Sequence, residues 1–126
     1  MAKVLIAEDD DAVREFVRRA LVHGGHDVAT ANDGLDALDH LSDDAAFDLL
    51  ITDIVMPGMD GIALALKVSK EFPKTAILMM TGYSAERQRA HNLDELIHEV
   101  IAKPFSLKQI CDAAEDALSV RQRKLH

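Results

Sequence analysis

The sequence predicts an α/β fold in which helices cover both faces of a parallel sheet. Short apolar segments alternate along the chain with longer segments of helical periodicity, and there are five of each. The strand segments are almost continuously apolar, which is typical of strands that are buried on both faces. Right-handed crossovers between such strands produce a doubly wound α/β sandwich of five strands and five helices.

Length, charge and cysteine content exclude several classes of protein. The 126 residues fit one domain, which we place at 1–120, followed by a short basic tail at 121–126. The net charge of −8 argues against DNA binding, and no apolar run approaches the ~20 residues of a membrane span. The single cysteine, Cys111, suits a reducing compartment, so we expect a cytoplasmic protein without disulfides.

The first two strands are expected at 4–7 and 27–31. Four acidic residues at 8–11 end the first strand, and Gly24 ends the helix that follows. The buried face of that helix is predicted from residues three and four positions apart: Val13, Phe16, Val17, Ala20 and Leu21. A second, shorter helix is marked by a leucine repeat: Leu35, Leu38 and Leu41.

The central strand is expected at 48–52, with Asp53 just past its end. Breaker and turn residues at 56–61 then return the chain, and Asp60 is suited to cap the next helix. The buried face of that helix is predicted to contain Ile62, Ala65 and Leu66. The helix should end before Pro73.

The remaining elements are expected to be two strands and two helices. The strands are placed at 75–80 and 97–102, and the polar stretch 84–95 between them is interpreted as a helix. Ser106 and Gln109 match the capping box that begins a helix. The buried face of this last helix is predicted to contain Leu107, Ile110, Cys111, Ala114 and Leu118.

Reactive side chains follow four of the five strands. Glu8 and Asp9 follow the first strand, Asp53 the third, Thr81 the fourth and Lys103 the fifth. Because the carboxyl ends of parallel strands meet at one edge of the sheet, these side chains should converge. Carboxylate oxygens suit Mg²⁺, and a lysine and a hydroxyl suit a phosphoryl group that Asp53 could accept. Each residue alone also has a structural explanation, as a helix-capping acid, a turn or a surface lysine.

The chain resembles the receiver domains of two-component response regulators, which have a CheY-like fold. The resemblance covers Lys3 to Leu118. It is carried by Val-Leu-Ile-Ala-Glu-Asp-Asp at 4–10, Asp-Leu-Leu-Ile-Thr-Asp-Ile-Val-Met-Pro-Gly-Met-Asp-Gly at 48–61, Met-Thr-Gly at 80–82 and Lys-Pro-Phe at 103–105. It implies a sheet with strand order 2-1-3-4-5 and a receiver domain at 1–120.

The resemblance also implies the roles of the site residues. Asp53 would be phosphorylated by a phosphohistidine on a histidine kinase or a histidine phosphotransferase. Thr81 and Lys103 would contact the phosphoryl oxygens, and the family typically keeps the Lys103–Pro104 bond cis. The Mg²⁺ ligands would be Asp9, Asp53 and the backbone carbonyl of Val55, with Glu8 acting largely through water.

One position departs from the family pattern. Receivers often carry a switch aromatic three residues before the lysine, and this position is Val100 here. The usual coupling of threonine to that aromatic cannot then operate in its usual form. Tyr83, the only tyrosine, either replaces the switch residue or merely covers the following helix.

More narrowly, the chain resembles the CpdR-type stand-alone receivers of alphaproteobacteria. This implies a protein that catalyses only its own phosphorylation and dephosphorylation, and whose output is binding to a downstream protein. That target is expected to be a AAA+ protease that degrades cell-cycle regulators. The alternatives are a phosphorylation-independent adaptor and an intermediate shuttle in a phosphorelay. A haloacid-dehalogenase-type phosphatase is disfavoured, because Val55 stands where that class needs a second acid.

Overall fold

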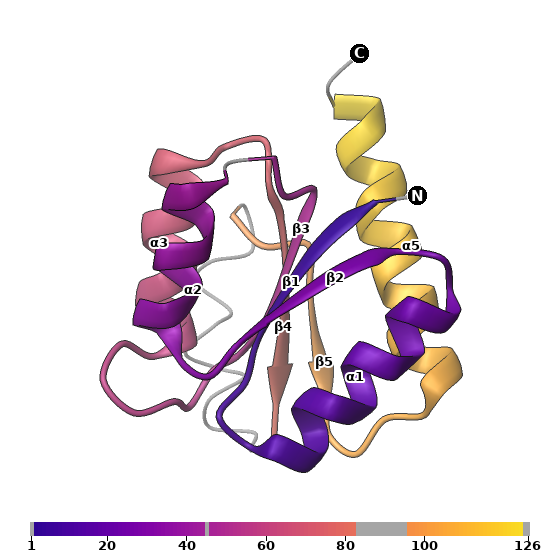
Figure 1. The fold of residues 1–126 in the computed structure, drawn as a ribbon. Helices are drawn as coiled ribbons and strands as arrows, with labels where there is room; N and C mark the ends of the chain where they lie inside the picture. The colour runs from indigo at the N-terminus through magenta and orange to yellow at the C-terminus, as the bar shows by residue number, and fades with distance from the viewer. Residues whose placement is uncertain (1, 45, 83–95, 125–126) are drawn as a thin grey trace.

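The protein forms a five-stranded parallel sheet with strand order β2-β1-β3-β4-β5, as predicted (Figure 1). The computed structural model describes residues 2–44, 46–82 and 96–124. The strands are β1 (Lys3–Ala7), β2 (Asp27–Ala31), β3 (Leu49–Asp53), β4 (Ala76–Thr81) and β5 (Glu99–Ala102). All neighbouring strands pair in parallel register, so their carboxyl ends lie at one edge.

Helices cover both faces of the sheet. They are α1 (Asp11–His23), α2 (Gly34–Asp43), α3 (Gly61–Glu71) and α5 (Leu107–Lys124). In Figure 1, α2 and α3 lie on one face, and α1 and α5 lie on the other. These are four of the five predicted helices, and the helix predicted at 84–95 lies outside the described residues. No helix in the described ranges is both long and apolar enough to cross a membrane.

The sheet separates two apolar cores because successive strand residues point to opposite faces. Leu5, Leu50 and Met79 pack into the core beneath α2 and α3. Val4, Ile6 and Ile51 instead pack into the core beneath α1 and α5. Every residue of β3 is buried, which explains why the central strands are apolar at consecutive positions.

Several leucine and phenylalanine positions differ from the predicted buried faces. Leu66 is 47% exposed, because α3 begins at Gly61 and turns a face containing Leu64, Ala65 and Val68 toward the core. The other large side chains that were predicted to be buried but are exposed are Phe16, Leu35 and Leu107. Periodicity predicted the four described helices, but one residue assigned to the buried face of each is exposed, since neighbours on a helix differ by only 100°.

Side-chain caps begin the helices as the sequence predicts. The Asp60 carboxylate accepts a hydrogen bond from Ala63 N at 2.9 Å. Ser106 and Gln109 form a reciprocal capping box, in which Ser106 N donates to Gln109 Oε1 at 2.7 Å and Gln109 N donates to Ser106 Oγ at 3.0 Å. The Asp10 carboxylate caps α1. These caps satisfy amides that have no partner within the helix.

The C-terminal segment continues α5 through Lys124. Its Arg121 side chain forms an ion pair with Asp48 at 3.0 Å. Arg121 Nε also donates to the backbone oxygen of Lys74 at 2.5 Å. This arginine therefore joins α5 to the amino-terminal edge of the sheet.

Candidate functional site

The candidate site lies at the carboxyl edge of the sheet, where the order of the strands reverses. The crossover from β1 leads to β2 on one side, whereas β3 pairs with β1 on the other side. A parallel sheet opens a crevice at such a switch point. The crevice here is a pocket of about 680 Å³ that reaches Glu8, Asp53 and Lys103.

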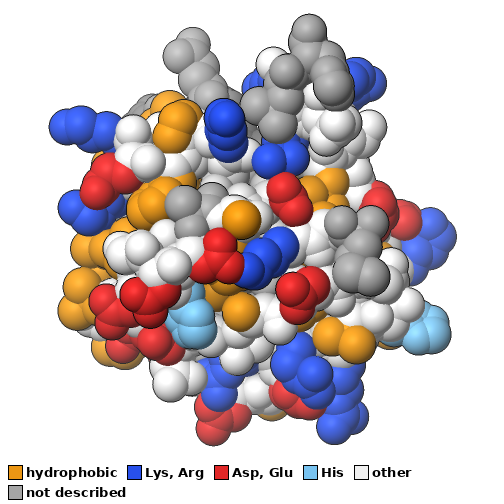
Figure 2. All heavy atoms as spheres, turned by 45° about the horizontal axis from the view of Figure 1, so that its top comes forward, with side chains coloured by type: hydrophobic (Ala, Val, Ile, Leu, Met, Phe, Trp, Pro, Cys, Tyr) orange, Lys and Arg blue, Asp and Glu red, His pale blue; other side chains and the backbone are white. Residues whose placement is uncertain are grey.

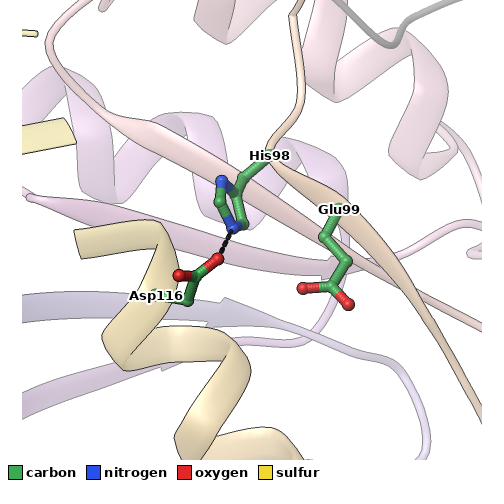
Figure 3. Close-up of side chains that lie close together, drawn as sticks. All are labelled: His98, Glu99 and Asp116. Atoms are coloured by element: carbon green, nitrogen blue, oxygen red, sulfur yellow. Dashed lines mark hydrogen bonds and ion pairs between the residues drawn. The ribbon is translucent and has the colours of Figure 1, made fainter. Parts of the chain in front are cut away.

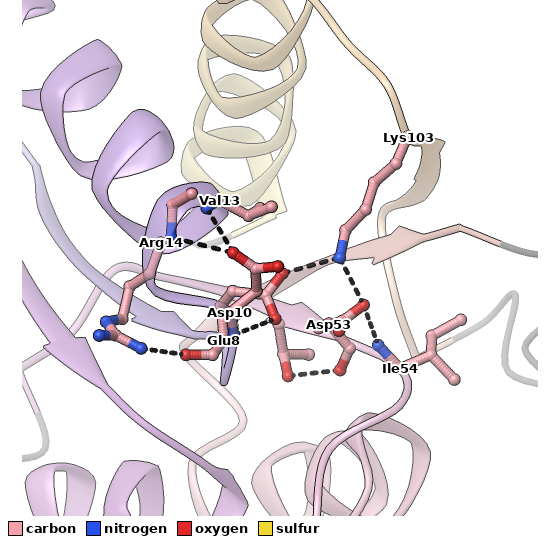
Figure 4. Close-up of polar contacts among 9 residues, drawn as sticks. Glu8, Asp10, Val13, Arg14, Asp53, Ile54 and Lys103 are labelled. Carbon is pink, nitrogen blue, oxygen red and sulfur yellow. Dashed lines mark hydrogen bonds and ion pairs between the residues drawn. The ribbon is translucent and has the colours of Figure 1, made fainter.

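Lys103 joins the two buried carboxylates of the site (Figure 4). Its Nζ lies 2.7 Å from Glu8 Oε1 and 3.2 Å from Asp53 Oδ1. Glu8 is fully buried, and Asp53 is 7% exposed. A buried carboxylate needs a compensating charge, so the lysine offsets part of the cost of placing two acids side by side.

Burial also changes the protonation of the site. The pKa of the Glu8 carboxyl is raised from 4.5 to about 7. Burial is the largest cause, and the Asp53 charge acts in the same direction, whereas the hydrogen bonds from Lys103 and the Asp10 amide oppose the rise. Burial by itself would lower the pKa of Lys103. The hydrogen bond to Glu8 and the charges of Asp53 and Glu8 outweigh this effect, so the pKa of Lys103 is raised. At neutral pH the lysine is therefore charged and Glu8 is close to its point of titration.

Backbone contacts hold Asp53 in place. Its Oδ1 accepts a hydrogen bond from Ile54 N at 3.0 Å, and the Ile54 oxygen accepts one from Gly61 N at 2.7 Å. A Cβ on Gly61 would lie only 1.9 Å from the Asp53 backbone oxygen. Glycine at 61 thus allows α3 to begin directly against the end of β3.

Three carboxylates in the site could hold a metal ion. Ligand oxygens of Glu8, Asp9 and Asp53 all lie within 4.8 Å of one another. An all-oxygen set with net negative charge and one exposed member, Asp9, matches the preference of Mg²⁺, which binds few protein oxygens and keeps several waters. The residues present therefore fit a hard divalent cation.

Thr81 lies beside this cluster, at the end of β4, and is buried. Lys103 N donates to the Thr81 backbone oxygen at 2.7 Å, which extends the pairing of β4 and β5 up to the site. The Lys103–Pro104 peptide bond is cis. Of the other predicted positions, Val55 is exposed at the pocket, Val100 lies partly buried in the core beneath α2 and α3, and Tyr83 lies outside the described residues.

Two parts of the site were not predicted from the sequence. Arg14 Nη1 donates to the Glu8 backbone oxygen at 2.8 Å, which links α1 to the acidic loop. Phe16 and Phe105 lie with ring centroids 6.2 Å apart at the apolar side of the pocket. Their pairing joins residues from α1 and from the segment after β5, so local sequence patterns carried no signal for it.

A second group of possible ligands lies away from this edge (Figure 3). His98 Nε2 and Asp116 Oδ2 lie 2.7 Å apart, and an oxygen of Glu99 lies within 4.8 Å of them. The histidine and Asp116 already satisfy each other, and both acids are exposed. These three residues therefore form a surface pair with a neighbouring acid, without the buried charge that marks the cluster around Asp53.

Known proteins are similar to this chain over nearly its whole length. The family model described as response regulator receiver domain matches residues 4–115. The response regulator receiver protein CpdR from Brucella abortus is 36% identical over 118 residues, which are 94% of this chain and 98% of that protein. The response regulator MprA from Mycobacterium tuberculosis is 33% identical over 108 residues, and the match spans only 46% of its length.

The fold is likewise shared with solved structures. The response regulator protein TrrA from Thermotoga maritima, solved in complex with Mg²⁺ and BeF, superposes with a TM-score of 0.83. It is 26% identical, and the match covers 93% of this chain and 99% of TrrA.

Proposed function

This chain belongs to the response regulator receiver domain family, and we propose that it is a phosphorylation switch in which Asp53 accepts the phosphoryl group. The observation that carries the proposal is the buried Asp53 carboxylate at the sheet edge, 3.2 Å from the Lys103 ammonium and within 4.8 Å of carboxylate oxygens of Glu8 and Asp9. Membership of the family implies a histidine kinase or phosphotransfer protein as the partner.

The proposed reaction transfers a phosphoryl group from a phosphohistidine. An Asp53 carboxylate oxygen forms the new O–P bond as the N–P bond of the donor breaks. The imidazole of the donor leaves with the electrons of that bond and takes up a proton. Asp53 becomes an acyl phosphate, and its hydrolysis returns the carboxylate and releases inorganic phosphate. Receiver domains are generally signal transducers rather than enzymes, so we infer no other catalysis.

Lys103 is suited to stabilise the transferred group. Its ammonium now lies between Glu8 and Asp53, and phosphorylation of Asp53 would place phosphoryl oxygens within its reach. We assign Thr81 the role of a hydroxyl donor to the same oxygens, because it lies at the end of the neighbouring strand. Charge-assisted hydrogen bonds of this kind are the strongest that a protein offers to an anion.

We assign Mg²⁺ as the cofactor of the site. Asp9, Asp53 and the backbone carbonyl of Val55 would hold it, with Glu8 acting largely through water. Bound Mg²⁺ would neutralise charge on the phosphoryl oxygens during transfer. Support comes from the all-oxygen cluster and from the structure of TrrA with Mg²⁺ and BeF.

The proposed output is a change in protein binding by a receiver domain at 1–120. The match to almost the whole of CpdR supports a CpdR-like regulator. We therefore infer a cytoplasmic adaptor that hands its signal to a protein target, with a AAA+ protease as the first candidate. Val100 leaves the usual switch position without an aromatic ring, so Tyr83 is our candidate for that role.

The decisive test is intact-mass spectrometry after incubation with acetyl phosphate, with and without Mg²⁺. We expect the protein to gain one phosphoryl group only with Mg²⁺, and Asp53→Asn to gain none. Asp11→Asn is the matched control, because Asp11 is an exposed acid in the first turn of α1 and lies outside the cluster. Labelling that persists in Asp53→Asn would contradict the assignment. If acetyl phosphate fails, a phosphorylated histidine phosphotransferase is the next donor, and no transfer from it would favour a phosphorylation-independent adaptor.

A further inference from the structure

A groove of about 580 Å³ lies at the amino-terminal edge of the sheet, opposite Asp53. Its apolar wall comes from the segment before β5 and from α5 and includes Leu96, Ile97, Ala117 and Val120. Lys74 and Lys124 also line it, from the loop after α3 and from the last turn of α5. Leu96 is 41% exposed, so apolar surface is presented to solvent between two cations.

The distribution of ion pairs makes this edge distinctive. The chain has 14 lysines and arginines, and 12 remain when Arg87 and Arg89 outside the described residues are set aside. Eight of the 12 form an ion pair with a carboxylate: Lys3, Arg14, Arg18, Arg19, Lys67, Lys103, Lys108 and Arg121. The other four described cations are Lys70, Lys74, Arg123 and Lys124.

Two of these four cations, Lys74 and Lys124, line the groove. Lys70 and Lys74 lie in the last turn of α3 and in the loop after it, and Arg123 and Lys124 lie in the last turn of α5. Figure 2 brings this edge forward and shows lysine and arginine side chains beside exposed apolar ones in its upper part. Cations at helix ends also complement the helix dipole. Lys74 lies outside any helix, so that explanation does not account for it.

Arg121 lines the groove and is itself paired with an acid. The guanidinium pairs with Asp48 and donates to the Lys74 backbone oxygen, which fixes α5 against the loop. Thr75 Oγ1 donates to the Phe47 oxygen at 2.8 Å and anchors the other side of the same loop. The groove therefore has defined walls and two lysines that no described carboxylate neutralises.

We propose that this groove docks an acidic peptide segment of a partner protein, which places an apolar side chain against Leu96 and Val120 and carboxylates beside Lys74 and Lys124. Complementary charge at Lys74 and Lys124 favours such a partner, and it directs the partner to this groove because the rest of this acidic protein repels it. The apolar wall favours a peptide over a small anion, which would gain nothing from that surface. Nucleic acid is disfavoured by the net charge of −8.

The location makes this docking surface independent of the phosphorylation site. The groove is lined by the first residues of β4, whereas Thr81 at the other end of that strand borders the site. Peptide binding at the groove should not depend on phosphorylation, so Asp53→Asn should bind the peptide as well as the wild type does. A failure of phosphorylation would leave this result unchanged, so the two ideas are tested separately.

The test is an NMR titration of the ¹⁵N-labelled full chain with the peptide Ac-Glu-Asp-Leu-Leu-Asp-Glu-NH2. We expect saturable shifts of amides along the groove, at Ile97, His98, Val120 and Arg121, that weaken with added salt. Two comparison peptides, one with lysines in place of the acids and one with serines in place of the leucines, should bind at least about tenfold more weakly. Absence of shifts in the groove, or equal binding of the lysine peptide, would refute the proposal.

Substitutions of exposed residues separate the contribution of the lysine charges to binding from that of the apolar wall. Because these residues are exposed, the fold should be unchanged. Lys74→Glu combined with Lys124→Glu should weaken binding at least about tenfold, and Leu96→Ser about fivefold. Lys108→Glu is the control, because it makes the charge change of one such substitution at the opposite end of α5. Wild-type affinity in the double variant would refute the role of the lysines. Light scattering tests whether a second copy of the chain occupies the groove instead. A wild-type dimer that the double variant abolishes would make the groove a self-interface and would overturn the proposal.

Discussion

Glu8 and Lys103 form an ion pair of 2.7 Å across 95 residues of sequence, and the Glu8 side chain is fully buried. The pair exists because β1 and β5 both end at the carboxyl edge of the sheet, on either side of β3 and β4. Asp53 lies 3.2 Å from the same ammonium. One lysine thus serves two acids, and this shared charge determines how the site responds to mutation, pH and metal.

Removing the lysine should destabilise the metal-free protein. In Lys103→Met the buried Glu8 loses its partner, and Glu8 must either stay charged in an apolar setting or take up a proton. We expect a loss of about 1–3 kcal/mol in the free energy of unfolding, larger at pH 8 than at pH 6. Urea denaturation with EDTA measures it. Lys108→Met removes an exposed lysine and should change stability by less than about 0.5 kcal/mol; an equal effect would show that the buried pair has no special weight.

The raised pKa of Glu8 predicts a definite pH dependence. Its value of about 7 in the fold lies above the ordinary 4.5, so the folded state holds the proton more tightly than the unfolded chain. Between pH 4.5 and pH 7 the free energy of unfolding therefore falls as the pH rises. Above pH 7 Glu8 is charged in both states, and the loss of stability is complete. We expect the metal-free protein to be more stable at pH 5.5 than at pH 7.5. Glu8→Gln should flatten this part of the profile, whereas an unchanged slope would assign it to another group.

Metal binding should release a proton near neutral pH. A cation at the Glu8, Asp9 and Asp53 cluster favours the charged carboxylates, so it should lower the pKa of Glu8. The apparent affinity for Mg²⁺ is therefore expected to rise between pH 6 and pH 8. Isothermal titration calorimetry in buffers of different ionisation enthalpy measures the released proton. Glu8→Gln should release less, and the same release in this variant would place the proton on another group.

Gly61 should be required for the position of Asp53. Alanine would put a Cβ 1.9 Å from the Asp53 backbone oxygen, so either β3 or the start of α3 must move. We expect Gly61→Ala to lose about 1–3 kcal/mol of stability and to slow labelling by acetyl phosphate. The control is Gly82→Ala beside the same pocket, where an added Cβ meets no atom within 4 Å. Equal labelling rates in the two variants would contradict the positioning role.

The ion pair of Arg121 with Asp48 should stabilise the C-terminal helix. Both side chains are largely shielded, with 17% and 29% of their surface exposed, and the arginine also binds a backbone oxygen. We expect Arg121→Gln to lose about 0.5–2 kcal/mol. Arg19→Gln, which removes an exposed partner of Glu15, should cost less. Thermal unfolding followed by circular dichroism compares them, and a smaller effect at Arg121 would show that the tail is not anchored.

Most of the architecture could be predicted from local sequence. The apolar runs located all five strands, although β5 begins at Glu99 rather than at residue 97. The capping roles of Asp60 and Ser106 followed from residue type and spacing, since a cap acts within one helical turn. The exposed faces of α3 and α5 were harder to predict, because they depend on which neighbour each helix contacts.

The sequence by itself determined the fold class, the strand order implied by the family motifs and the set of residues at the carboxyl edge. It could do so because strand ends and turn residues are local features, and parallel strands bring their ends to one edge. Only the tertiary structure decided that Lys103 bridges Glu8 and Asp53, that Gly61 packs on the Asp53 carbonyl and that Arg121 reaches Asp48. These contacts join segments far apart in sequence, and their distances and burial arise only when the helices pack against the sheet.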